Sequence, residues 1–365
     1  MSPAVSVCIP VYNGEPHLKG CLESVLAQSE SDLEVIVVDN CSEDGSLAVA
    51  EAFAEQDRRI AVHRNSRNIG LVANLNRCID LASSPWIKFV FHDDWLAPTC
   101  VERLLTGAPS SLVVCQRTIE FDDVGRDVRR RYLGVRHWDS LDAMFPGRGR
   151  IAASDFLDAA LRNVGVNFVG EPTATLMSTE AVRRLGGFDP ELVQFVDWDL
   201  WLRLGGDDGL HYVGEPLATF RVHAAGATAA NSRYRAYEAR YLDPLRIVRR
   251  MGRDAAYAPV RAFATERGVD LDGLAVRFGV RAEVAAGQAA DDGRTAWARF
   301  LAADPELAAL LDARATPAQR LLERYVRQTH VPLGPVRWLG RPVARHVART
   351  GRAVVRRLRQ GVGAR

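Results

Sequence analysis

The chain has 365 residues and a net charge of +2, with 47% apolar and 25% charged residues. This composition is typical of a soluble globular protein with enough apolar residues to bury a core, and the length allows one to three domains. No stretch approaches the roughly 18 to 20 apolar residues that a membrane span requires, so a membrane-spanning protein is excluded.

The cysteines and the amino terminus indicate the compartment. Six cysteines occur, none in a close C-x-x-C pair, and we interpret them as reduced thiols of a cytosolic protein. The amino terminus carries no basic region before its short apolar run, so we expect no signal peptide. These features predict a cytoplasmic protein.

Short apolar runs alternate with helical patterns through the first third of the chain. The expected strands cover residues 5–9, 33–38, 60–63, 86–91 and 112–121. The expected helices cover 15–28, 46–56 and 71–81, and Asn13 is the expected N-cap of the first. Strands that alternate with helices through short loops are typical of a mostly parallel sheet with helices on both faces. We therefore predict an α/β fold.

The rest of the chain changes character twice. Residues 122–150 are rich in Arg, Gly and Asp and are expected to form a surface excursion. Further strands are expected at 173–177 and 210–221, with helices at 151–162, 179–185 and 196–204. Beyond about residue 231 only Ala- and Arg-rich helical patterns follow. We predict an α/β domain over 1–228, a helical domain over 229–330 and a basic amphipathic tail over 331–365.

Asp93 and Asp94 follow the expected strand 86–91 directly. In an open α/β sheet ligands bind outside the carboxyl ends of the strands. Two adjacent carboxylates repel each other unless a cation lies between them, and oxygen ligands suit Mg²⁺ or Mn²⁺ carrying a phosphorylated substrate. The alternative is a solvated turn without a ligand.

Five stretches in a fixed order extend this pattern over about residues 4–223. They are VSVCIPVYNGEPHLKGCLESVLAQS, LEVIVVDNCSEDGS, RNIGLVANLNRCIDLASSPWIKFVFHDDWLAP, GGFDP and VDWDLWLRL. Together they resemble the family 2 inverting glycosyltransferases, which have the GT-A fold. The resemblance implies that residues 1–228 form a GT-A catalytic domain acting on a UDP-, dTDP- or GDP-linked sugar.

The resemblance also implies which residues bind this donor. Asp39 would accept a hydrogen bond from the nucleotide base. The other residues implied near base and ribose are Pro10, Tyr12, Asn13, Arg67 and Asn68. Asn68 alternatively supplies only turn geometry, and Asn76 on the following helix is expected to face the same site.

By the same resemblance, Asp94 binds a divalent ion that bridges the donor phosphates, and Asp93 supports the ribose or the metal. Arg221 and His223 belong to an aromatic-Arg-x-His ending that would reach the phosphates or complete the metal site. One departure is Phe91, which stands where many relatives carry a further acid.

The resemblance places the catalytic base at Asp197, in the string Val196-Asp197-Trp198-Asp199. Because Val196 replaces the usual glutamate, we expect Asp197 to ionise more easily than in a carboxylate pair. Asp199 is the second candidate, although an i,i+4 ion pair with Arg203 is its favoured role.

Three residues match positions that line the acceptor pocket of relatives: Glu171, Thr173 and Trp198. For Trp198, as for Trp201 on the same helix, core packing is the favoured role. The arginine-rich tail predicts contact with anionic lipid at the inner face of the cytoplasmic membrane. We do not expect a nucleic-acid partner, because no recognition fold accompanies the basic run.

The leading hypothesis is an inverting, metal-assisted glycosyltransferase that acts on a glycan or lipid-linked acceptor in cell-surface polysaccharide assembly. Processive synthases are excluded because Val336-Arg337-Trp338 lacks the glutamine of their Q-x-x-R-W motif. The alternatives are a catalytically weak module that binds sugar nucleotides, favoured by Phe91 and Val196, and a nucleotidyltransferase. The latter usually needs a glycine-rich basic loop, which PVYNGEP does not resemble.

Overall fold

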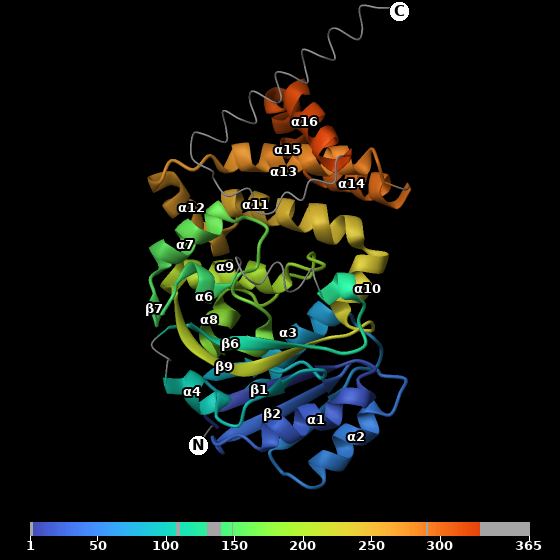
Figure 1. The fold of residues 1–365 in the computed structure, drawn as a ribbon. Helices are drawn as coiled ribbons and strands as arrows, with labels where there is room; N and C mark the ends of the chain where they lie inside the picture. Colours follow the sequence, from blue (N-terminus) through green and yellow to red (C-terminus); the bar gives the residue numbers. More distant parts are fainter. Residues whose placement is uncertain (1–2, 107–109, 130–139, 148, 290, 329–365) are drawn as a thin grey trace, which may run out of the picture.

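The computed structural model describes residues 3–106, 110–129, 140–147, 149–289 and 291–328 (Figure 1). Its centre is a mixed sheet of nine strands. The strands are β1 (Val5–Val11), β2 (Leu33–Asp39), β3 (Ile60–Arg64), β4 (Trp86–Phe89), β5 (Trp95–Leu96), β6 (Leu112–Phe121), β7 (Arg150–Ile151), β8 (Thr175–Ser178) and β9 (Leu210–Val222). Their order is β3-β2-β1-β4-β8-β6-β9-β5, with β7 paired to β9.

The first four strands run parallel, as the alternating pattern predicted. β8 then pairs antiparallel with both β4 and β6, while β6 and β9 run parallel to each other. Strands β1 and β4 therefore end at the same edge, where polar loops follow them. This confirms the predicted α/β fold.

Helices cover both faces of the sheet. One face packs on α1 (Glu15–Leu26), α2 (Ser46–Ala54) and α4 (Cys100–Thr106). The other packs on α3 (Leu71–Leu81), α7 (Ala153–Arg162), α8 (Thr179–Arg184) and α9 (Val196–Asp208). Alternation along β1 separates the two cores, because Val7 and Ile9 face the first set while Cys8 faces the second. Two short helices complete this part of the chain: α6 (Leu141–Met144) lies between β6 and β7, and α10 (Ala227–Tyr234) follows β9.

Residues 238–289 and 291–328 form a further helical layer beyond α9 (Figure 1). After a π-helical turn (Glu238–Leu242) it comprises α11 (Asp243–Arg253), α12 (Ala258–Glu266), α13 (Leu271–Ala286), α14 (Asp291–Ala303), α15 (Pro305–Arg314) and α16 (Pro317–Gln328). Met251 and Val260 belong to the same apolar cluster as α9, so this layer shares a core with the sheet. The domain boundary near residue 228, between the α/β domain and the helical domain, stays a prediction from the sequence.

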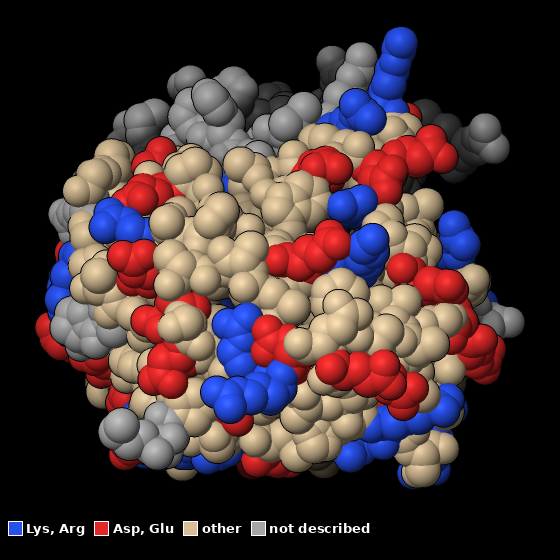
Figure 2. Space-filling model, turned by 90° about the horizontal axis from the view of Figure 1, so that it is seen from below, with Lys and Arg blue, Asp and Glu red and all other residues tan. Residues whose placement is uncertain are grey.

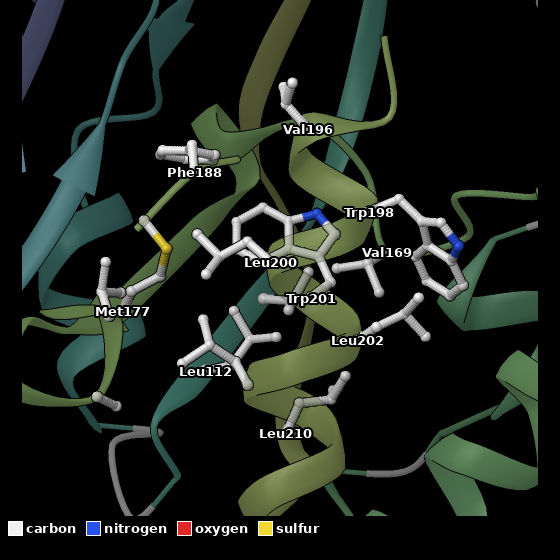
Figure 3. Close-up of a cluster of buried hydrophobic side chains, with 14 of the residues drawn as sticks. Leu112, Val169, Met177, Phe188, Val196, Trp198, Leu200, Trp201, Leu202 and Leu210 are labelled. Atoms are coloured by element: carbon white, nitrogen blue, oxygen red, sulfur yellow. The ribbon is translucent and has the colours of Figure 1, made fainter. Parts of the chain in front are cut away.

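Helix α9 lies at the centre of that shared core. Trp198 and Trp201 are fully buried among apolar side chains of several elements, with Met177 and Phe188 on one side (Figure 3). The helix ends before Gly209, whose φ of 77° favours glycine. A Cβ at this position would also collide with the backbone of Ile151. Helix α9 is therefore held along its whole length.

All six cysteines are free, and five of them are buried, in keeping with the expected thiols. Among the helices of the described ranges, none is both long and apolar enough to cross a bilayer. Seen from the face formed by the first two helices, acidic and basic side chains are interspersed (Figure 2). The predicted tail 331–365 lies outside the described residues, as does part of the excursion 122–150.

The buried ion pair on α9 generates a prediction about stability. Arg203 donates to Asp199 through Nε at 3.0 Å and to the carbonyls of Leu185 and Gly187, which confirms the expected i,i+4 pair. Removing one partner leaves a buried charge, so Arg203→Met should lower the free energy of unfolding by about 3–5 kcal/mol. Urea denaturation measures this change.

The matched control is Arg162→Met, which breaks an exposed i,i+4 pair with Asp158 on α7. That change should cost less than about 1 kcal/mol, because water already solvates both charges. Equal losses in the two variants would contradict the buried role of Arg203.

Candidate active site

A cleft of about 1900 Å³ lies outside the carboxyl ends of β1 and β4. Loops from both halves of the sheet meet there, together with the start of α9 and helix α10. The predicted site residues that line this cleft are Pro10, Tyr12, Asn13, Asn68, Asp93, Glu171, Asp197, Arg221 and His223. The topology therefore gathers residues that are more than two hundred positions apart in the sequence.

The loop after β1 is joined to the loop after β2 by reciprocal hydrogen bonds. The backbone N–H of Asn13 donates to Ser42 Oγ at 3.0 Å, and Asn13 Oδ1 accepts from the N–H of Glu43 at 2.9 Å. Asn13 has a left-handed φ of 49°, and Gly14 occupies the N-cap position of α1. The expected helix-capping role of Asn13 is thus wrong, because its side chain bridges two loops instead.

Gly14 also lets the loop after β1 approach the loop after β4. A Cβ at Gly14 would collide with the ring of His92, whose Nδ1 lies 3.4 Å from the carbonyl oxygen of Pro10. A larger residue at position 14 would separate the two loops.

Four asparagines form a hydrogen-bonded network where β2 and β3 end. Asn40 Oδ1 accepts from Asn65 Nδ2 at 2.9 Å, and Asn65 Nδ2 also donates to Asn74 Oδ1 at 2.8 Å. Asn40 Nδ2 donates to Asn68 Oδ1 at 2.9 Å, and the same oxygen accepts from the N–H of Gly70. Asn68 therefore supplies turn geometry at the cleft wall, the alternative that the sequence left open.

Two expected donor-binding residues lie away from the cleft surface. Asp39 is 1% exposed, accepts from the backbone N–H of Ser42, and pairs with Arg64 Nε at 3.3 Å. Arg67 is exposed on its loop and is not among the cleft-lining residues. Asn40, adjacent to Asp39, is the residue of this strand end that lines the cleft.

Asp93 and His223 form the polar pair at the opposite wall. Asp93 Oδ2 lies 2.8 Å from His223 Nε2, and both side chains are about 85% buried. Arg221 Nε donates to the backbone carbonyl of Asp93 at 3.1 Å, and its guanidinium stacks over Trp95. Burial raises the pKa of Asp93, but the His223 hydrogen bond and the nearby histidines outweigh it and lower that pKa overall.

Asp94 does not face the cleft, contrary to the expected metal contact. It is 1% exposed, Oδ1 accepts from the N–H of Arg221 at 2.9 Å, and Oδ2 accepts from Thr173 Oγ1. Burial and the neighbouring Asp93 charge raise its pKa well above the usual range. Thr173 is equally buried, and its carbonyl accepts from the buried amine of Lys88. Asp94 and Thr173 thus support the site from beneath, and Thr173 does not reach an acceptor.

Asp197 lies in the first turn of α9 at the cleft floor. Its Oδ1 accepts from the N–H of Trp198 at 2.7 Å, and its Oδ2 accepts from Asn167 Nδ2 at 2.8 Å. The Asn167 amide is oriented by two backbone donors, Val169 N–H and Gly170 N–H, at 3.1 and 3.0 Å. The carboxylate is therefore held in one orientation.

The electrostatic surroundings of Asp197 include a second carboxylate. Burial and the charge of Glu171 raise its pKa to about 7, against weaker opposing effects that include Arg117. Glu171 itself pairs with Arg117 in the cleft wall. Glu171, from another segment, thus supplies a like charge near Asp197 although Val196 removes one locally, and easier ionisation than in a carboxylate pair stays a prediction.

Packing places two further residues outside the cleft. Trp198 is fully buried against Phe168, with ring centroids 4.9 Å apart, so it belongs to the core and not to an acceptor pocket. Asn76 faces away from the cleft and pairs with the backbone of Phe188 at 2.8 Å in both directions. No local sequence pattern could have predicted this pairing, because Phe188 lies 112 positions after Asn76.

Sequence reasoning missed Asn167, Asn40 and Lys88. A lone asparagine in a loop has no pattern, but Asn40 follows Asp39 at a strand end, a place where ligands bind. Lys88 interrupts an apolar strand, which was a readable signal of a buried polar contact. Among the described residues no group of three or more metal-ligating side chains is assembled.

Comparisons with known proteins agree with this architecture. Residues 6–162 match the family model for glycosyl transferase family 2. The uncharacterized protein MT1568 of Mycobacterium tuberculosis is 31% identical over 229 residues, which are 62% of this chain and 69% of that protein. The putative glycosyltransferase EpsH of Bacillus subtilis is 34% identical over 156 residues, 41% of this chain and 45% of EpsH. The chain thus spans less than half of EpsH.

Solved structures share the fold over most of the chain. Staphylococcus aureus TarS 1-349 in complex with UDP-GlcNAc has a TM-score of 0.59 at 14% identity, covering 90% of this chain and 92% of that one. The same protein in complex with UDP gives a TM-score of 0.54 at 16% identity, covering 89% and 87%. The chain belongs to glycosyl transferase family 2 and has the GT-A fold, followed by a helical region.

The raised pKa of Asp197 predicts how stability depends on pH. The folded-state pKa is about 7, above the roughly 3.9 of an unfolded aspartate. The folded state therefore holds a proton that the unfolded state has lost, and this contribution is complete below pH ~4 and disappears as the pH rises through ~7. Asp197→Asn should remove this slope, worth up to about 1.4 kcal/mol per pH unit.

Urea denaturation at pH 5, 6, 7 and 8 measures the slope for wild type and variant. Asp158→Asn, which changes an exposed carboxylate on α7, is the control and should follow the wild-type slope. A wild type and an Asp197→Asn variant with identical slopes would show that Asp197 is not shifted.

Proposed function

We propose that this chain transfers a sugar from a nucleotide-diphosphate donor to a hydroxyl group of its acceptor, with inversion at the anomeric carbon. The observation that carries the proposal is Asp197, a half-buried carboxyl group that lines the cleft, is held by two hydrogen bonds and has a pKa of about 7. A general base is most effective when its pKa lies near the working pH.

The donor would lie between the loop after β1 and the Asp93–His223 pair. Tyr12 is 42% exposed at the cleft and offers a ring for the nucleobase, and Asn40 and Asn68 offer polar groups beside it. Asp39 remains a proposed acceptor for a base N–H, reached through movement of Arg64. TarS binds UDP-GlcNAc and UDP in its own structures, which favours a nucleotide-sugar ligand for this shared fold.

Asp93 and His223 are the residues that would hold a divalent ion such as Mg²⁺ or Mn²⁺. A carboxylate and an imidazole suit Mn²⁺, and phosphate oxygens of the donor would complete the coordination. When bound, such an ion neutralises charge on the departing diphosphate. Arg221 fixes the backbone of Asp93. Gly226, the N-cap of α10, lines the same cleft and offers no side-chain cap.

Asp197 would remove the proton from the attacking acceptor hydroxyl. The oxygen of that hydroxyl bonds to the anomeric carbon while the bond from this carbon to the diphosphate breaks on the opposite face. Glu171, at the same wall, is the proposed acceptor-side residue. We also propose a glycan or lipid-linked acceptor in cell-surface polysaccharide assembly. The arginine-rich sequence 331–365 favours binding to an anionic membrane surface, where such an acceptor would be located.

Replacing the base tests the proposal. With a panel of UDP-, dTDP- and GDP-sugars and Mn²⁺, wild type should release nucleotide diphosphate, whereas Asp197→Asn should lose at least about a hundredfold in kcat. Wild-type kcat/KM should rise with pH and reach half its plateau near pH 7, because the base of the free enzyme must be unprotonated.

Asp208→Asn, at the other end of α9, is the matched control and should keep wild-type kcat. Donor binding without turnover by the wild type would instead identify a binding module. Full turnover by Asp197→Asn would show that another group is the base.

Metal dependence distinguishes the two adjacent aspartates. Asp93→Asn should raise the Mn²⁺ concentration for half-maximal activity by at least about tenfold, since a ligand is lost. Asp94→Asn should leave that concentration unchanged, because Asp94 is buried and already hydrogen-bonded to Thr173 and Arg221. Chelation with EDTA should abolish wild-type turnover. A stronger Mn²⁺ defect in Asp94→Asn than in Asp93→Asn would restore Asp94 as the metal residue.

A further inference from the structure

The carboxylate of Asp243, the first residue of α11, reaches the loop that precedes Asp197. Asp243 is fully buried, and its Oδ2 accepts from three consecutive backbone N–H groups of that loop. The donors are Val193, Gln194 and Phe195, at 2.9, 2.7 and 3.2 Å. All three residues line the cleft directly before α9.

This contact satisfies the backbone N–H groups of the loop that leads into α9, and not those of the first turn of the helix. Phe195 occupies the N-cap position of α9 and has no side chain able to accept a hydrogen bond. Here the acceptor for the approach to α9 comes from a residue 48 positions later in the chain.

Other residues near the start of the C-terminal region fasten the same loop. Asn231 Nδ2 donates to the carbonyl of Val193 at 2.9 Å, and Gln194 Nε2 donates to Thr228 Oγ1 at 3.2 Å. Further back, Arg250 of α11 pairs with Asp189. The segment before the proposed base is therefore held by the helical region and α10 together.

We propose that Asp243 is a positioning residue for the transfer reaction: it sets the backbone at 193–195 and thereby the place of Asp197 in the cleft. The inference rests on the proposed role of Asp197 as base. It links the first residue of α11 to the reaction through the backbone of the loop before α9. A shift of about 1 Å in a reacting group can cost about a hundredfold in rate, so a loosened loop should lower kcat without weakening donor binding.

The test compares Asp243→Asn and Asp243→Leu in the full chain. Asn keeps one oxygen for the three N–H groups, whereas Leu leaves them without an acceptor. We expect kcat to fall at least about tenfold in Asp243→Leu and less in Asp243→Asn, while the Kd for UDP, dTDP and GDP stays within about twofold. If Asp243→Leu does not fold, an Asp243→Asn variant with a kcat drop of about threefold or more carries the test.

The matched control is the same substitution at Asp304. This residue caps α15 through the N–H of Leu307 and pairs with Arg249 of α11, so it performs a similar task away from the cleft. Asp304→Asn and Asp304→Leu should lower stability and keep kcat. An equal fall of kcat in both pairs, or a folded Asp243→Leu with wild-type kcat, would overturn the proposal.

A double substitution separates this inference from the base assignment. If Asp243 acts through Asp197, adding Asp243→Asn to Asp197→Asn should leave the residual rate unchanged. If the double variant instead loses rate by the product of the two single reductions, Asp243 does not act through Asp197. Full turnover by Asp197→Asn would refute the base assignment, and a fall of kcat in Asp243→Asn alone would then still support its control of the cleft loop.

Discussion

The start of helix α9 is the constraint on which the cleft depends. Asn167 holds the side chain of Asp197 from one side, while Asp243 holds the backbone before it from the other. Neither contact is local, and each comes from a different part of the chain. The buried length of α9, with Trp198, Trp201 and the Arg203–Asp199 pair, prevents the helix from moving to relieve either contact. Rigidity of this kind is what general-base chemistry requires.

The aspartates of the two cleft walls have pKa values shifted in opposite directions. The hydrogen bond from His223 lowers the pKa of Asp93, whereas burial and the charge of Glu171 raise the pKa of Asp197. One wall therefore suits a metal ion and phosphates, and the other suits a proton acceptor. Beneath the first wall, Asp94, Thr173 and Lys88 form a buried chain that fixes the backbone of Arg221 and the end of β4.

The helical layer after residue 238 is joined to this site through Asp243, Arg250 and Tyr257. Tyr257 donates to Asp199, so the layer contacts α9 as well as the loop before it. The sequence shows only an Ala- and Arg-rich region without a catalytic pattern. Its contribution is seen only in the structure, because a backbone N–H that needs an acceptor has no signature in the sequence.

The sequence by itself determined the α/β order of elements, the polar residues at or just after the ends of β1, β2 and β4, and the family. Apolar periodicity and short motifs are local, so they can be read without coordinates. Only the tertiary structure decided that Asp93 faces the cleft while Asp94 is buried, because adjacent residues of a turn differ in direction but not in chemistry. It also decided the proton affinity of Asp197, since burial and the distant Glu171 act through space and not along the chain.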